Sequence, residues 1–167
     1  MKNGLYLVLL FVFSSCYTHK IYVVRHAERL DKSEDSPLSA QGFARANALK
    51  DTLQNVRIDS VFVTQYLRTR QTAELTFQAK NLSPAPYPAH PTSVIVARLQ
   101  RLKNKNALVV GHSDTVLEIV KGLGVSPQKV TKIGSNDYDN LFVIEVVKKF
   151  TKTQKTLTEK KYGAVSH

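Results

Sequence analysis

The chain has 167 residues, which is the size of one domain with a substantial hydrophobic core. Apolar residues make up 43% of it and aromatic residues 8%, a composition typical of a globular protein. Its 24 basic and 13 acidic residues give a formal net charge of +11, which favours anionic partners. Lys and Arg are spread along the chain, and no zinc-finger spacing, aromatic RNA-binding motif or helix-turn-helix pattern is visible. The charge therefore predicts phosphorylated substrates rather than nucleic acid.

The N-terminal segment has the pattern of a secretory signal. A short positive start precedes an apolar run from Leu5 to Phe13, too short for the roughly 20 residues that span a bilayer. Ser14, Ser15 and Cys16 follow, and a small residue before a cysteine resembles the cleavage site of bacterial lipoproteins, although Phe13 replaces the usual aliphatic residue. We predict a signal peptide over 1–16 with Cys16 as lipidation site, and a mature domain over 17–167. The expected location is the bacterial cell envelope, periplasmic or anchored to the membrane.

Two alternatives for this segment remain open at the level of the sequence. It is either an ordinary signal peptide with an unrelated cysteine or a buried first strand of the domain. In every case Cys16 is the only cysteine, so an internal disulfide is excluded.

The first half of the domain alternates apolar runs with amphipathic segments. Short β-branched runs at 21–24 and 61–63 predict buried strands. A charged, Ser-rich segment over 29–37 predicts a loop, after which Ser39 is placed to cap a helix. A second helix is expected over 68–80. Its buried side is expected to consist of Ala73, Leu75 and Phe77.

The second half continues the alternation after a segment over 82–91 whose four prolines exclude a regular helix. Helices are expected from Thr92 and over 115–123. Further strands are expected at 107–110, at 141–147 and around 156–161, the last two paired as a hairpin. Strands that alternate with helices predict an α/β domain, a three-layer α/β/α sandwich with a mostly parallel central sheet.

Polar clusters directly follow three of the predicted strands. They are Arg25-His26, Thr64 to Arg68, and His112. Because the carboxyl ends of parallel strands meet at one edge of a sheet, we expect these clusters to converge. A neutral imidazole is a good nucleophile near pH 7, and the planar fork of arginine binds phosphate oxygens in pairs. The clusters therefore predict a phosphate pocket without a metal.

These residues also carry a family resemblance. The histidine phosphatase superfamily, which includes cofactor-dependent phosphoglycerate mutases and phosphohistidine phosphatases, has an Arg-His-Gly/Ala motif similar to Val23-Val24-Arg25-His26-Ala27-Glu28. The helix after that motif resembles Leu38-Ser39-Ala40-Gln41-Gly42, and the second-arginine motif resembles Tyr66-Leu67-Arg68-Thr69-Arg70-Gln71-Thr72-Ala73-Glu74. The second-histidine motif resembles Val109-Val110-Gly111-His112-Ser113, and a strand entry of small bacterial members resembles Asp137 to Phe142. The first four of these motifs, in this order, are a specific signal.

The resemblance implies a phosphoglycerate mutase-like fold, closest in type to small bacterial phosphohistidine phosphatases. It implies that His26 attacks phosphorus and is transiently phosphorylated, while Arg25, Arg68 and His112 bind the phosphoryl oxygens. No cofactor or metal is implied. A metal site built from the two histidines, Glu28 and Asp114 is disfavoured because the arginines would repel the cation.

The sequence departs from the family pattern in its acid residue. Many members have a catalytic glutamate between the second arginine and the second histidine, but here no acidic residue lies between Glu74 and Asp114. Asp114 and Glu28 are the remaining candidates for the proton donor, with Asp114 preferred, and both can instead orient an arginine or histidine. Arg45 and Arg70 are open between substrate contact and a solvated helix face. The other histidines are expected to be exposed and without function: His19, His90 and His167.

The sequence therefore favours a metal-independent phosphatase that hydrolyses phosphate monoesters or phosphohistidine through a phosphohistidine on His26. Its expected partner is a phosphorylated small molecule or phosphoprotein. The main alternative is a catalytically weak or inactive module that binds phosphate or a phosphoprotein. A basic surface protein for nucleic acid or anionic lipid is a weaker alternative. A mutase is disfavoured because the chain is compact and predicted to be exported.

Overall fold

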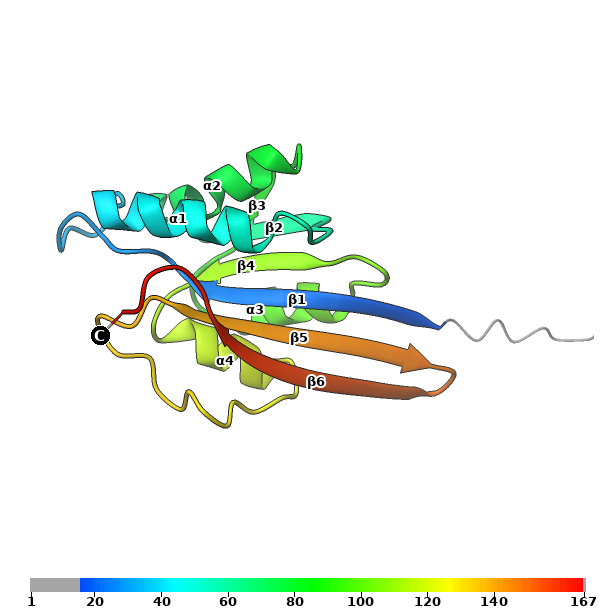
Figure 1. Cartoon of the computed structure of the whole chain (residues 1–167). Helices are drawn as coiled ribbons and strands as arrows, with labels where there is room; N and C mark the ends of the chain where they lie inside the picture. Colours follow the sequence, from blue (N-terminus) through cyan, green and yellow to red (C-terminus); the bar gives the residue numbers. More distant parts are fainter. Residues whose placement is uncertain (1–15, 167) are drawn as a thin grey trace, which may run out of the picture.

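The centre of the molecule is one mixed sheet (Figure 1). In the part of the chain that the computed structural model describes, residues 16–166, six strands lie in the order β3-β2-β4-β1-β5-β6. The strands are β1 (Tyr17–Arg25), β2 (Ser60–Val63), β3 (Pro84–Pro86), β4 (Ala107–Gly111), β5 (Asn140–Lys149) and β6 (Lys152–Lys161). The helices are α1 (Ala40–Thr52), α2 (Leu67–Ala79), α3 (Ser93–Gln100) and α4 (Thr115–Gly122).

The sheet is parallel where the predicted polar clusters lie. β3, β2, β4 and β1 pair in parallel, and β5 and β6 continue the sheet from β1 as an antiparallel hairpin. The four parallel strands therefore end at the same edge. The predicted α/β class and mostly parallel sheet are confirmed.

Helices cover both faces of the sheet, because side chains along a strand alternate between its faces. Val24 and Val110 pack with the apolar sides of α1 and α2, whereas their neighbours Val23 and Val109 pack with α3 and α4. Figure 1 shows α1 and α2 together on one side of the sheet and α3 and α4 on the other. This is the expected three-layer arrangement.

Two details of the predicted elements differ from the structure. Leu75 is 37% exposed, since it lies on the opposite side of α2 from the buried pair Ala73 and Phe77. The proline-rich segment contains a strand, β3, which was not expected. β3 forms the edge of the sheet, and an edge strand tolerates proline because its outer N–H groups need no partner.

Ser39 caps α1 as predicted, with its hydroxyl accepting a hydrogen bond from the Gly42 N–H.

The predicted signal segment lies outside the described residues except for Cys16, which is exposed and carries a free thiol. Over residues 16–166, no helix has both the length and the apolar character that a membrane crossing requires.

Candidate active site

The polar clusters of β1 and β4 are brought side by side by strand pairing. β1 and β4 pair in parallel from Ile21 opposite Ala107 to Arg25 opposite Gly111. The His26 N–H then donates to the Gly111 carbonyl over 2.9 Å, which extends the pairing by one residue. The two imidazoles that follow, His26 and His112, meet edge to face with their centroids 5.4 Å apart.

A cavity of about 410 Å³ opens where the parallel strands end. Its lining comes from the loops that follow β1, β2, β3 and β4. The lining residues are Arg25, His26, Arg29, Tyr66, Arg68, Ala89, His90, His112, Ser113 and Asp114. The structure thus brings Arg25, His26, Arg68 and His112 together.

His26 is held as a neutral imidazole with one nitrogen free. Its Nδ1 lies 2.8 Å from the carbonyl oxygen of Ala27, which can only accept, so Nδ1 carries the proton and the lone pair is on Nε2. Burial lowers the pKa of His26 to about 2, and the positive charge of Arg25 acts in the same direction. In the unliganded site His26 is therefore uncharged at neutral pH, with Nε2 available as a nucleophile.

His112 is also neutral, and two neighbours orient its ring. Its Nδ1 lies 3.5 Å from Nη2 of Arg68, which can only donate, so Nδ1 accepts and Nε2 donates to the Thr64 hydroxyl over 3.0 Å. Burial lowers the pKa of His112 to about 4, assisted by the charge of Arg68. Because a hydroxyl both donates and accepts, Thr64 can support either tautomer of His112.

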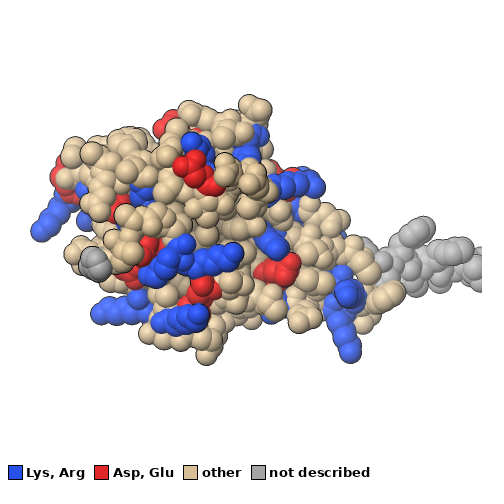
Figure 2. Space-filling model, viewed as in Figure 1, with Lys and Arg blue, Asp and Glu red and all other residues tan. Residues whose placement is uncertain are grey.

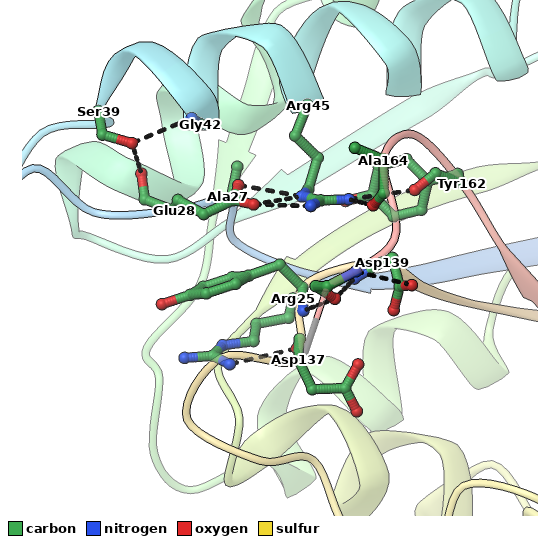
Figure 3. Close-up of polar contacts among 12 residues, drawn as sticks. Arg25, Ala27, Glu28, Ser39, Gly42, Arg45, Asp137, Asp139, Tyr162 and Ala164 are labelled. Atoms are coloured by element: carbon green, nitrogen blue, oxygen red, sulfur yellow. Dashed lines mark hydrogen bonds and ion pairs between the residues drawn. The ribbon is translucent and has the colours of Figure 1, made fainter.

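Arg25 is positioned by the segment between α4 and β5. Its Nη1 donates to the carbonyl oxygens of Gly134 and Asp137 over 2.8 and 3.2 Å, and its guanidinium lies 4.0 Å from the centre of the Tyr138 ring. Figure 3 shows Arg25 reaching this segment, in which Asp137 is labelled. The ring of Tyr138 is also 6.1 Å from that of His26, so this tyrosine forms one wall of the site.

Arg68 is positioned by the loop between β1 and α1. Its Nη1 donates to the Glu34 carbonyl over 2.7 Å, and its guanidinium lies 4.3 Å from the centre of the Tyr66 ring. The same loop is fastened to the start of α2, where the Leu67 N–H donates to the Asp35 carboxylate over 2.6 Å.

The two guanidinium groups are desolvated cations, and each has a hydrogen-bond donor without a partner among the described residues. The Nε atoms of Arg25 and Arg68 are buried and have no hydrogen-bond partner among the described residues. Burial lowers the pKa of both groups, yet an arginine keeps its charge because its ordinary pKa is so high. Buried donors without partners are rare in proteins, and here they suit a bound anion.

The motif around Gln71 holds the loops of the site by hydrogen bonds. The hydroxyl of Thr72 accepts from the Ala27 N–H over 2.8 Å and donates to the Arg68 carbonyl over 2.7 Å. The side chain of Gln71 accepts from the Leu38 N–H over 2.8 Å. The pair thus locks the segment after His26 onto the helix that carries Arg68.

Glu28 does not enter the cavity. Arg45 of α1 binds both of its carboxylate oxygens through Nε, over 2.9 and 3.0 Å, and one of them through Nη2 over 2.6 Å. Nη1 of Arg45 donates to the carbonyls of Tyr162 and Ala164, so the pair joins β1, α1 and the C-terminal segment (Figure 3). A carboxylate held in this way is badly placed to protonate a leaving group, and Arg45 is a structural residue.

The backbone of Glu28 explains the glycine of the first helix motif. A Cβ on Gly42 would lie within van der Waals overlap of the Glu28 carbonyl oxygen. That carbonyl accepts the Ser39 N–H over 2.9 Å at the start of α1. The close approach of α1 to the loop after His26 therefore requires glycine at this position.

Asp114 lies at the rim of the cavity, and its partner there is a histidine that was expected to be inert. Nε2 of His90 lies 3.2 Å from Oδ2 of Asp114, and both side chains are exposed. His90 is exposed as expected, whereas the expected exposure of His19 was wrong. His19 is 4% exposed, because β1 begins at Tyr17 rather than at Ile21 and places it inside the sheet.

The remaining sequence candidates lie elsewhere. Arg70 is exposed and outside the cavity, on the solvated side of α2. His167 lies outside the described residues. Sequence reasoning missed the contributions of Thr64, Tyr66, His90 and Tyr138, of which all but His90 lie in a cluster or motif that was singled out.

The charges outside the site are dispersed. Lys and Arg side chains are scattered over the face seen in Figure 2, with Asp and Glu among them, rather than gathered in one patch. Over residues 16–166, no three His, Cys, Asp or Glu side chains are grouped as a metal site would require.

Comparison with known proteins agrees with this site. The sequence pattern of the histidine phosphatase superfamily (branch 1) matches residues 21–89, the stretch that contains Arg25, His26 and Arg68. The chain is thus similar to this superfamily over residues 21–89. A search of curated proteins gives no match.

Solved structures share the fold at low sequence identity. A protein histidine phosphatase SixA complexed with tungstate is 23% identical with a TM-score of 0.61, over 85% of this chain and 96% of that chain. A putative alpha-ribazole-5'-P phosphatase from Escherichia coli is 17% identical with a TM-score of 0.66, over 87% and 97%. A phosphoserine phosphatase mutant from Entamoeba histolytica in complex with phosphoserine is 12% identical with a TM-score of 0.58, over 83% and 95%. These similarities establish the fold.

Proposed function

We propose that this protein is a metal-independent phosphatase that forms a covalent phosphohistidine on His26. The observation that carries the proposal is the neutral His26, with a free Nε2, in one cavity with two buried arginines whose Nε donors lack partners. Phosphoryl transfer demands little covalent chemistry from a protein beyond a placed nucleophile and oriented positive donors, and the cavity supplies both.

The reaction has two displacement steps. Nε2 of His26 attacks phosphorus, the P–N bond forms, and the P–O bond to the leaving group breaks while that oxygen gains a proton. Water then attacks the phosphohistidine, the P–N bond breaks, and inorganic phosphate leaves with the water oxygen. The Nδ1–H bond to the Ala27 carbonyl fixes the ring through both steps and favours the positive charge that the phosphorylated imidazole bears.

Arg25, Arg68 and His112 bind the phosphoryl oxygens. Different segments hold the two guanidinium groups, Arg25 by the segment before β5 and Arg68 by the loop before α1. His112 donates to phosphate from Nδ1 when its Nε2 accepts from Thr64 instead of donating to it. A bound phosphate thereby replaces the weak 3.5 Å contact between His112 and Arg68.

The substrate class is a phosphate monoester or a phosphohistidine, on a small molecule or a protein. The solved structures of this fold include proteins described as a protein histidine phosphatase and a phosphoserine phosphatase, which span both classes. Among the residues that line the cavity, Asp114 is the sole carboxylate in the described part of the chain, and it is exposed. A phosphohistidine or an aryl phosphate, whose leaving group needs little protonation, is therefore the easier substrate.

A second candidate function is a phosphate-binding module without turnover. The observation in its favour is the exposed position of the nearest carboxylate, combined with the use of Glu28 in the pair with Arg45. Such a module would be stabilised against heat by inorganic phosphate and would hydrolyse nothing.

Hydrolysis of 4-nitrophenyl phosphate in the presence of EDTA separates the two functions. A phosphatase of this type turns over under those conditions, and His26→Asn abolishes the activity. The matched control is His19→Gln. His19 is a buried histidine within β1, whereas His26 directly follows that strand, and His19 lies outside the cavity. This variant is expected to keep its activity. Turnover by the His26 variant would contradict the proposal, and so would loss of the wild-type activity on addition of EDTA.

We also propose that the domain is exported and anchored through Cys16. Support comes from the exposed thiol of Cys16 and from its position before β1, whose other end carries His26. Since β1 runs for nine residues, roughly 30 Å at the usual rise, an anchor at its start would leave the cavity facing away from the membrane. Intact-mass analysis of membrane-extracted protein tests this proposal. Loss of the lipid mass in Cys16→Ala is the expected result, and an unlipidated wild-type chain would contradict it.

A further inference from the structure

The rim of the cavity holds a histidine and a carboxylate that the proposed phosphoryl-transfer steps have not used. His90 lies in the loop after β3, and Asp114 is the N-cap residue of α4. Because β3 is parallel to β2, its loop leaves from the same edge of the sheet as the loops of His26 and Arg68. Both rim side chains line the same cavity as His26.

The loop of His90 is anchored on both sides of the sheet edge. The Tyr87 hydroxyl donates to the Val110 carbonyl over 3.0 Å, and the Tyr87 N–H donates to the Val63 carbonyl over 2.9 Å. The Ala89 N–H donates to the Gln65 side chain over 3.3 Å. These contacts fix the backbone immediately before His90, so the imidazole is presented at a defined place on the rim.

The contact between the two side chains has a defined direction. A carboxylate only accepts, so Nε2 of His90 donates its proton to Oδ2 of Asp114 across the 3.2 Å between them. With Nε2 directed at Asp114, Nδ1 of the protonated ring carries the proton that is free to move. An imidazolium at the mouth of a phosphate cavity is a general acid by its chemistry.

The other groups in the cavity are already committed. Nε2 of His26 is the nucleophile, His112 is bound between Thr64 and Arg68, and arginine does not release its proton near neutral pH. Asp114 is exposed, and its Oδ2 accepts the Nε2–H of His90. Of the imidazoles and carboxylates that line the cavity, His90 remains as the group that can carry the proton.

We propose that His90 protonates the leaving group and that Asp114 positions the His90 ring. As the P–O bond breaks, a proton moves from the His90 imidazolium to the departing oxygen. The neutral His90 then takes a proton from the water that attacks the phosphohistidine, which restores the imidazolium. This inference rests on the proposed phosphatase function and supplies the donor for which the sequence offers no glutamate.

The test compares alkyl and aryl phosphates in His90→Ala. An alkoxide needs protonation, whereas 4-nitrophenolate is a good leaving group. Hydrolysis of an alkyl phosphate such as glycerol 3-phosphate is expected to fall by about 10²–10⁴-fold in the variant, with less than a tenfold change for 4-nitrophenyl phosphate. Asp51→Asn, an exposed carboxylate on α1 outside the cavity, serves as the control for Asp114→Asn, which is expected to lower the alkyl rate alone.

Added imidazole supplies a readout that a structural role for His90 would not move. His90 is exposed at the rim, so free imidazole can reach its place in the alanine variant. We expect imidazole to restore the alkyl phosphate rate of His90→Ala and to leave the wild-type rate unchanged. Equal losses on both substrates, no loss on either, or no rescue would overturn the role of His90.

The two proposals fail in different ways. If wild-type protein hydrolyses no aryl phosphate, the phosphatase function fails before His90 is tested. If wild-type protein is active on aryl phosphate and the His90 variant behaves as wild type on alkyl phosphate, the inference about His90 fails alone. Unchanged thermal midpoints of the variants establish that they are folded in either case.

Discussion

The two sides of the cavity are built differently. On the phosphate side, Arg25, His26, Arg68 and His112 are between 4% and 9% exposed. On the rim, the side chains of His90 and Asp114 are 60% and 61% exposed. The first set follows directly from strand pairing and a helix start, whereas the second comes from a loop and a helix cap. The phosphate side is thus a property of the fold, and the rim is where we propose that the leaving group is protonated.

Burial also separates the two sides electrostatically. On the phosphate side it keeps two histidines neutral beside two charged arginines, whose Nε donors have no partner among residues 16–166. On the rim, water screens the pair of His90 and Asp114, and a surface pair of this kind adds little to stability. Changes on the phosphate side should therefore affect stability and every substrate alike, while changes at the rim should depend on the leaving group.

The largest expected effect is on stability, from breaking the buried pair under the phosphate side. Arg45→Met leaves the carboxylate of Glu28 buried without its partner and removes the donors to the Tyr162 and Ala164 carbonyls. Loss of one member of a buried ion pair costs about 3–5 kcal/mol. Urea unfolding measures this directly, and Lys50→Met, which removes a partly exposed cation from the same helix, should change the free energy of unfolding little. A similar stability for the Arg45 variant would refute a structural role for this pair.

The next effect is on catalysis at the phosphate side. Arg68→Ala removes a charged donor to the phosphoryl group, and loss of one such donor costs about 10²–10³-fold in rate. The loss in kcat/KM should be the same for aryl and alkyl phosphates, unlike that of a rim variant. Arg70→Ala, two residues along the same helix but outside the cavity, is the matched control and should retain activity. A loss confined to one substrate class would break the distinction between the two sides.

A smaller effect is expected in the pH dependence of stability. The folded state keeps His26 and His112 neutral with pKa values of about 2 and about 4, whereas an unfolded histidine takes up a proton near pH 6.5. The unfolded state therefore binds more protons below pH 6.5, and stability falls as the pH falls through that point. Between pH 7 and pH 5 each histidine should contribute a loss of about 2 kcal/mol in unliganded protein. Replacement of His112 by Asn should remove its share, and a pH-independent stability over this range would contradict the neutral state.

The smallest effect is expected from the residue that supports the His112 tautomer. Thr64→Val removes the hydroxyl that lies 3.0 Å from Nε2 of His112 without a large change in volume. Loss of one such hydrogen bond, worth about 1 kcal/mol, should lower kcat/KM by roughly five- to tenfold. Thr64→Ser should retain most of the activity because it keeps the hydroxyl. If serine and valine behave alike, the hydroxyl does not act on His112.

Much of the phosphate side follows from the sequence because its causes are local. The apolar runs before Arg25 and His112 are long enough to predict strands, and parallel strands end at one edge. The helix that carries Arg68 was likewise visible in its composition. The arrangement of these residues then needs only the pairing rules of an α/β sheet.

The rim residue His90 and the pair of Glu28 and Arg45 could not be predicted from the sequence, for physical reasons. β3 has three residues, two of them proline, so its sequence shows no strand pattern. The loop that places His90 at the cavity edge follows this strand and could not be predicted either. Glu28 lies two residues after His26, but Arg45 binds its carboxylate from a helix 17 positions away. Contacts between distant segments depend on packing and leave no trace in local periodicity.

The measurement that tests the central claim most directly is the site and isomer of the phosphoryl intermediate. Protein reacted with 4-nitrophenyl phosphate and quenched in alkali would be analysed by 31P NMR and by mass spectrometry of its peptides. Since Nδ1 of His26 is bound to the Ala27 carbonyl, phosphate should be found on Nε2 of His26. Phosphate on Nδ1, on another residue, or hydrolysis that leaves no acid-labile intermediate at His26 would contradict the account.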